Sequence, residues 1–171
     1  MWTHTKQALA SLALGLALFV CVWVSRVFFT GQVLAPLIPL TGLVAIACIA
    51  ILGGALPTLP LGFGYGLMRH DRVLAGALVV ALLACAIELA TSAAAVSWWL
   101  FKTWWVLPVE CLTVLVVFVI AALAGSRSLP RVVRPLRTRV GAGLFVLMTV
   151  GALCWPWLYS CIHLNVCRLV P

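Results

Sequence analysis

The chain has 171 residues, of which 65% are hydrophobic, and its mean hydropathy is +1.25. Charged residues make up 8% of the chain, with 11 Lys or Arg against 3 Asp or Glu, whereas about a quarter is usual in a soluble domain. A water-soluble fold of this size would have too little polar surface to cover its core, which excludes a soluble enzyme, a nucleic-acid-binding domain and a disordered chain. The composition therefore predicts an integral membrane protein.

Five apolar segments are long enough to cross a bilayer, which takes about 20 residues in a helix. The predicted spans cover about residues 8–30, 33–56, 73–100, 104–124 and 140–159. These segments are apolar on all sides and lack the alternation of a membrane barrel, so each is expected to satisfy its backbone as a helix. The sequence predicts an all-α integral membrane protein, a single transmembrane domain over residues 1–171 that forms a bundle of five transmembrane helices.

Prolines and glycines set the expected end of the second span. Pro57 and Pro60 follow its apolar stretch and are expected to stop the helix. The run Gly62-Phe63-Gly64-Tyr65-Gly66 then predicts a flexible turn. It follows a membrane helix and no buried strand, so it does not indicate a dinucleotide-binding site.

The basic residues indicate how the spans are oriented, because Lys and Arg are more frequent in cytoplasmic loops. With the N-terminus inside and the C-terminus outside, eight basic residues fall on the inner side and three on the outer. The inner eight are Lys6, Arg69, Arg72, Arg127, Arg131, Arg134, Arg137 and Arg139, and the outer three are Arg26, Lys102 and Arg168. This orientation makes residues 160–171 an outer tail and suggests a multi-pass protein of the cell (inner) membrane.

Residues 125–139 are predicted to form a basic inner loop, in which two prolines prevent a long helix. Its arginines are Arg127, Arg131, Arg134, Arg137 and Arg139. The expected partners are anionic lipid headgroups, and an acidic cytoplasmic protein is the alternative. The loop has no aromatic residues for base stacking, which argues against nucleic acid.

Glu88 is the acidic residue predicted to lie deepest in the bilayer, near its midplane. Its helical neighbours are small and form a predicted helix-contact face of Ala77, Ala81, Ala84, Thr91, Ser92 and Ala95. Such a face predicts that Glu88 points towards another helix and away from lipid. Its carboxyl is expected to be neutral, because no basic residue lies at its depth. Two roles for Glu88 follow from this position: a structural clamp that holds helices together, and a site that handles protons or cations.

Glu110 and Arg26 are predicted to lie at similar depths near the outer face. An ion pair between their helices is one interpretation. The others are that Arg26 extends to the headgroups alone, or that the two residues belong to a substrate site.

The chain contains seven cysteines, five of which fall one per span and are expected to pack as small hydrophobic residues. Cys161 and Cys167 in the outer tail are a candidate disulfide, which requires a turn between them. Free thiols, or a bond to Cys154 or to a partner, are the alternatives. The chain has no C-x-x-C pair and no zinc-type spacing, so no metal or cofactor is predicted.

No motif identifies a catalytic residue, because no serine has a G-x-S-x-G setting and the only Asp lies in a loop. The function expected from the sequence is a non-catalytic small polytopic membrane protein that binds other membrane proteins or forms a homo-oligomer. It would be an accessory, assembly or protective subunit of a larger membrane complex. The alternative is a transporter or channel subunit that uses Glu88 for protons or cations. A membrane enzyme of thiol-redox or lipid-modifying type is the second alternative.

Overall fold

The computed structural model describes residues 2–28, 43–69, 72–94, 106–128 and 134–163, with side chains within 5–25, 51–69, 72–91, 107–128 and 135–155. These residues form the helices α1 (Trp2–Phe28), α3 (Leu43–Met68), α4 (Val73–Ala94), α6 (Val106–Ser128) and α7 (Arg134–His163). Each of the five contains a stretch long and apolar enough to cross a membrane. The prediction of an all-helical chain with five helices long and apolar enough to span a membrane is therefore confirmed for the described residues.

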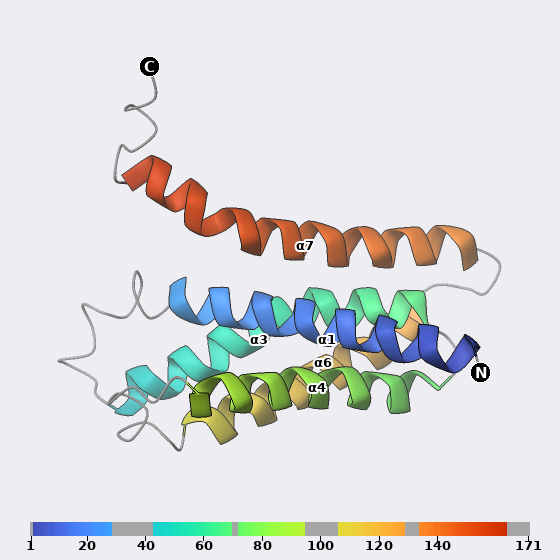
Figure 1. Cartoon of the computed structure of the whole chain (residues 1–171), viewed down its shortest axis with the longest axis horizontal. Helices are drawn as coiled ribbons and strands as arrows, with labels where there is room; N and C mark the ends of the chain where they lie inside the picture. Colours follow the sequence, from blue (N-terminus) through green and yellow to red (C-terminus); the bar gives the residue numbers. More distant parts are fainter. Residues whose placement is uncertain (1, 29–42, 70–71, 95–105, 129–133, 164–171) are drawn as a thin grey trace.

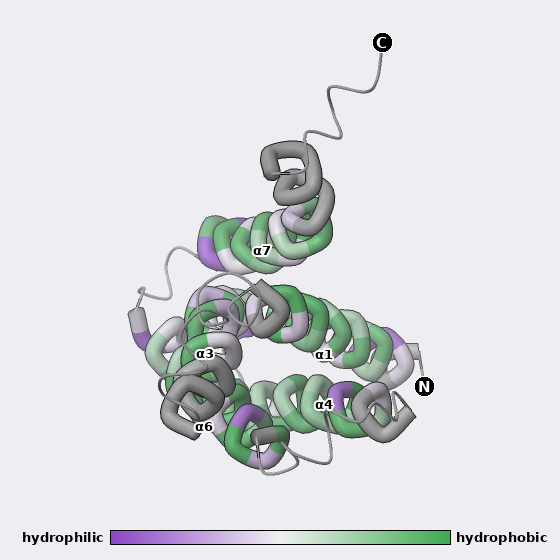
Figure 2. Tube along the Cα trace, turned by 90° about the vertical axis from the view of Figure 1, so that its left-hand side faces the viewer, coloured by the Kyte–Doolittle hydropathy of each residue, from purple (hydrophilic) through white to green (hydrophobic). Residues whose placement is uncertain are grey.

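Consecutive helices run in opposite directions, so the beginnings of α1, α4 and α7 lie at the same end as the final turns of α3 and α6 (Figure 1). Helix α3 is central and packs against α6, α7 and α1, while α4 packs against α1 and α6. Helix α7 lies at the edge of the bundle, against α3 and α1 (Figure 2). This arrangement leaves much of α7 exposed.

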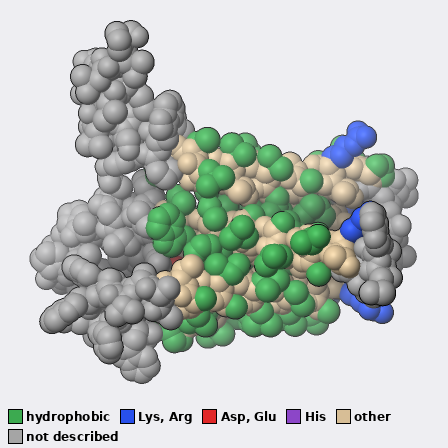
Figure 3. All heavy atoms as spheres, viewed as in Figure 1, with side chains coloured by type: hydrophobic (Ala, Val, Ile, Leu, Met, Phe, Trp, Pro, Cys, Tyr) green, Lys and Arg blue, Asp and Glu red, His purple; other side chains and the backbone are tan. Residues whose placement is uncertain are grey.

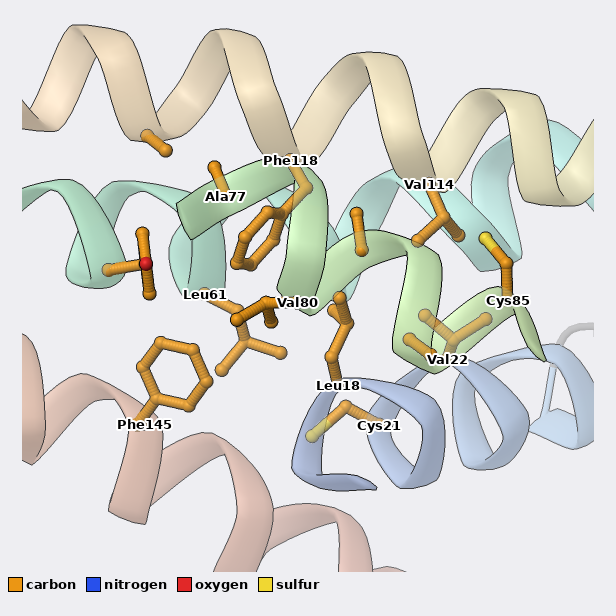
Figure 4. Packing of buried hydrophobic residues seen from close by; sticks show 14 of the residues in the cluster. Leu18, Cys21, Val22, Leu61, Ala77, Val80, Cys85, Val114, Phe118 and Phe145 are labelled. Atoms are coloured by element: carbon orange, nitrogen blue, oxygen red, sulfur yellow. The ribbon is translucent and has the colours of Figure 1, made fainter. Parts of the chain in front are cut away.

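The core is small and is built from apolar side chains of all five helices. Phe118 of α6 and Phe145 of α7 point into its centre from opposite sides, and Leu18, Leu61 and Val80 pack between them (Figure 4). Outside this core the surface of the helices is also apolar (Figure 3). In a soluble protein such a surface would aggregate, but in a bilayer it faces acyl chains of the same polarity.

Helix α3 continues through Pro57 and Pro60 to Met68, so the prediction that these prolines end the second helix is wrong. A proline removes one backbone donor, but membrane helices tolerate it where side chains and neighbouring helices satisfy the freed carbonyls. Within this stretch the hydroxyl of Thr58 donates to the carbonyl of Gly54. The apolar stretch of the described helix is consequently Ile51–Met68, while residues 33–42 of the predicted span lie outside the described part.

The glycine-rich run at residues 62–66 is helical and forms packing surfaces, so the predicted flexible turn is wrong as well. A Cβ atom at Gly62 would lie 2.8 Å from Cβ of Ala121, and one at Gly66 would overlap the carbonyl of Ala122, both on α6. Gly64 points to the opposite side, where it packs against Gly141 of α7. Glycines four residues apart lie on one face of a helix, and this spacing lets membrane helices approach closely.

The predicted basic loop is much shorter than expected. Residues 125–128 are the last turn of α6 and residues 134–139 are the first turns of α7, so the boundaries of 125–139 are wrong. Pro135 does not prevent this helix, because proline is tolerated in a first turn, where its missing donor has no acceptor. At its other end α7 continues to His163, so residues 160–163 are helical; residues 164–171 lie outside the described part.

Candidate functional site

Two buried carboxyl groups lie at similar depths on the adjacent helices α4 and α6. Glu88 is 3% exposed and Glu110 is 0% exposed. Glu88 lies 15 residues after the start of α4 and Glu110 lies 18 residues before the end of α6. These separations are about 22 Å and about 27 Å along the helices, at 1.5 Å per residue. Because the two helices are antiparallel, both carboxyls lie near the same end of the bundle.

Two thiols lie beside these carboxyls. The Sγ atom of Cys85 donates to the backbone carbonyl of Cys111, with a distance of 3.5 Å between sulfur and oxygen. Cys85 precedes Glu88 by about one turn of α4, and Cys111 follows Glu110 directly on α6. We call these four residues, Cys85, Glu88, Glu110 and Cys111, the carboxyl–thiol cluster.

Small residues on the neighbouring helices bring the backbones close to this cluster. A Cβ atom at Gly54 of α3 would lie 3.7 Å from Cγ of Glu110 and 3.4 Å from Cγ2 of Val114, so the backbone of α3 packs directly on that part of α6. On the other side of α4, a Cβ atom at Gly15 of α1 would lie 2.9 Å from Cβ of Leu83. Helix α4 is thereby held between α1 and α6, which fixes the depth of Glu88.

The predicted contact face of α4 is only partly buried. Ala77, Ala81 and Ala84 are buried together with Glu88. Thr91 is exposed, and its hydroxyl donates to the carbonyls of its own helix at Ile87 and Glu88.

Other predicted site residues lie outside the described side chains. They are Arg26, Ser92, Ala95, Cys161 and Cys167. The proposed pairing of Glu110 with Arg26 and the candidate disulfide therefore remain predictions.

The chemistry available to the cluster follows from its donors and acceptors. A carboxyl can hold or release a proton, and a thiol is a weak donor that can be oxidised. In the part of the chain that the structure describes, no group of three or more His, Cys, Asp or Glu is placed to hold a metal ion. The cluster is consequently best described as a buried acid and thiol site.

A second buried polar site lies at the other end of the bundle, around Arg137. Its side chain is 3% exposed, and its Nη2 donates to the carbonyls of Ser126 at 3.1 Å and of Gly125 and Gly66 at 3.4 Å. These carbonyls lie in the last turns of α6 and α3, where the helix supplies no further backbone donors. The hydroxyl of Ser128 also donates to the carbonyl of Gly125. The C-terminus of a helix carries partial negative charge, so one guanidinium stabilises two helix ends.

The prediction that Arg137 lies on a loop facing lipid headgroups is therefore wrong, because the side chain is buried. The other described basic residues do gather around the same end, as the blue side chains in Figure 3 show. Lys6, Arg72, Arg127 and Arg139 are exposed there, and Arg69 is half-buried. We call these five residues the basic end. The side chains of Arg131 and Arg134 lie outside the described part.

Comparison of the chain with protein-family models, with curated proteins and with solved structures finds no match. The function is therefore inferred from the chemistry and packing of this chain alone.

Proposed function

We propose that the protein is a non-catalytic membrane protein that binds other membrane proteins, as an accessory, assembly or protective subunit of a larger complex. The observation that carries this proposal is that one face of α7 points away from the rest of the bundle and is exposed. Leu147 and Val150 are exposed on that face, and a Cβ atom built at Gly143 or Gly151 meets no atom within 4 Å.

Glycine inside a helix is about 1 kcal/mol less favourable than alanine, but in membranes it permits close contact between helices. Gly62, Gly66 and Gly141 make such contacts within the bundle. Gly143 and Gly151 expose their backbone in the same way, but among the described residues no atom lies within 4 Å of a Cβ built at either position. A helix of a partner protein would use them in the same way.

The test is copurification in a mild detergent with the double variant Gly143→Leu and Gly151→Leu. We expect the wild-type protein to retain a partner at fixed stoichiometry and the double variant to lose it, because the leucines block close approach. The matched control is Val116→Leu with Ile120→Leu, which changes exposed apolar positions on α6 and should keep the partner.

The proposal would be overturned if the wild-type protein purified alone at the mass of one chain. It would be overturned equally if the double variant kept its partner in full. Coexpression of a tagged and an untagged copy shows whether the partner is a second copy of this chain.

A second candidate function is proton or cation handling by the carboxyl–thiol cluster. The supporting observation is that Glu88 and Glu110 are both buried on the adjacent helices α4 and α6, and acidic residues inside membrane spans often mark ion or proton pathways. A proton- or cation-dependent flux in reconstituted vesicles that Glu88→Gln abolishes would favour this function. Vesicles without such a flux would favour the accessory role.

We also propose that the basic end faces the cytoplasm, with the N-terminus inside and the C-terminus outside, in the cell (inner) membrane. Two things support this orientation: the clustering of exposed basic side chains at one end and the excess of Lys and Arg in cytoplasmic segments of membrane proteins. In this position Lys6, Arg72, Arg127 and Arg139 meet the anionic headgroups of the inner leaflet.

A further inference from the structure

Cys85 and Cys111 come from helices that are adjacent in the bundle, although the residues are 26 positions apart in the chain. The Sγ atom of Cys85 lies 3.5 Å from the backbone oxygen of Cys111, and both cysteines are free. Cys21 is placed differently, since it is buried on α1. Cys154 is exposed on the surface of α7. The sulfur of Cys85 on α4 therefore reaches the residue of α6 that carries the second sulfur a disulfide between these helices requires.

The depth of this pair places it away from the basic end. Cys85 lies 13 residues after Arg72 and Cys111 lies 16 residues before Arg127, which is about 20 Å and about 24 Å along the helices. If the basic end is cytoplasmic, both thiols lie in the outer half of the bilayer, next to the compartment in which disulfides persist. This step rests on the proposed orientation.

We propose that Cys85 and Cys111 are a reversible oxidation site, which hydrogen peroxide converts into a disulfide between α4 and α6. Cys111 is half-buried and Cys85 is 7% exposed, so the sulfur of Cys111 reacts first. It attacks one peroxide oxygen, the O–O bond breaks, and a sulfenic acid and one water are formed. The sulfur of Cys85 then attacks the sulfenic sulfur, the S–S bond forms, and the hydroxyl leaves with the thiol proton as a second water.

The product would link α4 to α6 one turn from Glu88 and next to Glu110. Each cysteine loses its proton, the two sulfurs are oxidised and the peroxide is reduced to two waters. A dithiol reductant reverses the change by thiol–disulfide exchange. The site would thus connect the redox state outside the cell to the spacing of the two helices that carry the buried carboxyls.

The experiment uses the full-length protein in detergent, treated with hydrogen peroxide, after which the remaining thiols are alkylated. Trypsin cleaves after Lys102 and separates the peptides Val73–Lys102 and Thr103–Arg127, each of which contains one cysteine. We expect these peptides to appear in the mass spectrum as one linked species, lighter by two hydrogens than the pair together. Dithiothreitol should separate them.

The variants Cys85→Ser and Cys111→Ser should each abolish the linked species, while Cys21→Ser should keep it. If a serine variant fails to fold, the linked peptides of the wild-type protein and their separation by dithiothreitol still test the proposal. Exposed Cys154 should react first, so its oxidation shows that peroxide reached the protein. If Cys154 is oxidised while the two peptides stay separate and alkylated, the proposal is wrong. Because detergent exposes both ends of the bundle, this result does not depend on orientation.

Discussion

Arg137 joins three helices through a single side chain. Its guanidinium belongs to α7, and the carbonyls that it binds belong to the last turns of α3 and α6. Hydrogen bonds from a charged donor contribute more than neutral ones, about 1.5–3 kcal/mol. Burial makes the arrangement sensitive, because removal of the guanidinium leaves buried carbonyls without their donor.

We expect Arg137→Gln to lower the free energy of unfolding by about 1.5–3 kcal/mol. The matched control is Arg139→Gln, which removes an exposed charge two residues further along α7 and should change stability by less than about 0.5 kcal/mol. Denaturation by a harsh detergent in mixed micelles, followed by circular dichroism, measures both. Equal stabilities of the two variants would contradict the role of Arg137 at the two helix ends.

Glu88 provides a second test at this scale. Burial favours the neutral carboxyl, and a glutamine keeps its shape and its capacity for hydrogen bonds. We therefore expect Glu88→Gln to fold and assemble almost normally. Glu88→Ala should lower the free energy of unfolding. The loss of a buried polar contact costs about 1–3 kcal/mol in soluble proteins and often less in membrane proteins.

The same denaturation assay measures both Glu88 variants, and a Gln variant as unstable as the Ala variant would contradict a neutral, structural carboxyl. A Gln variant that assembles normally but loses its cellular activity would instead favour proton handling. Activity and stability thus have to be followed in parallel.

Helix α3 packs through glycines on two of its faces, and each face contacts a different helix. Gly62 and Gly66 meet α6, and Gly64 meets α7. Any side chain on the first face must push α3 and α6 apart, because the nearest atoms belong to the backbone of α6. Close backbone contact therefore determines the position of α3 in the centre of the bundle.

We expect Gly66→Ala to destabilise the protein by about 1–3 kcal/mol, because its Cβ would overlap the carbonyl of Ala122. The control is Gly143→Ala in α7, where a Cβ meets no atom within 4 Å. This change should be neutral or stabilising by up to about 1 kcal/mol, since alanine is the better helix former. Thermal unfolding of the purified chain compares the two, and destabilisation of similar size in both would contradict the packing of α3 on α6.

The existence of the helices could be predicted from the sequence, but some of their ends could not. An apolar stretch of about 20 residues is sufficient evidence for a span, and each predicted span overlaps a helix in the structure. The end of α3 was missed because proline usually breaks helices in water, whereas α3 continues through Pro57 and Pro60, as membrane helices often do. The role of the glycines was missed for a related reason, since their spacing of four residues indicates packing only once the segment is known to be helical.

At the scale of the whole molecule, the basic end allows a direct test of orientation. We expect a reporter that is active only outside the cytoplasm to be active when fused after Pro171, and a cytoplasmic reporter to be active when fused before Met1. The beginning of α1 and the end of α7 lie at opposite ends of the bundle (Figure 1). Reporters active on the same side would contradict the five spans, and an exchange of the two sides would contradict the proposed orientation.

The burial of Glu88 could be predicted from the sequence, but the other members of the carboxyl–thiol cluster could not. Small neighbours of Glu88 indicated contact with another helix, and Glu88 is buried. Its neighbourhood with Glu110 was missed because the packing of α4 against α6 joins residues far apart in the chain and leaves no local pattern. The thiols were missed because cysteine in a membrane helix usually packs as a small apolar residue, and a long-range contact between two of them leaves no local pattern.

The position of Arg137 in the chain also bears on the order in which the protein is made. Synthesis proceeds from the N-terminus, so α3 and α6 leave the ribosome before α7. Until then the carbonyls of Gly66, Gly125 and Ser126 lack their guanidinium donor, although the hydroxyl of Ser128 already serves Gly125. Helix α7 therefore supplies a group that completes two earlier helices, and a nascent chain arrested before residue 137 would leave both helix ends without it.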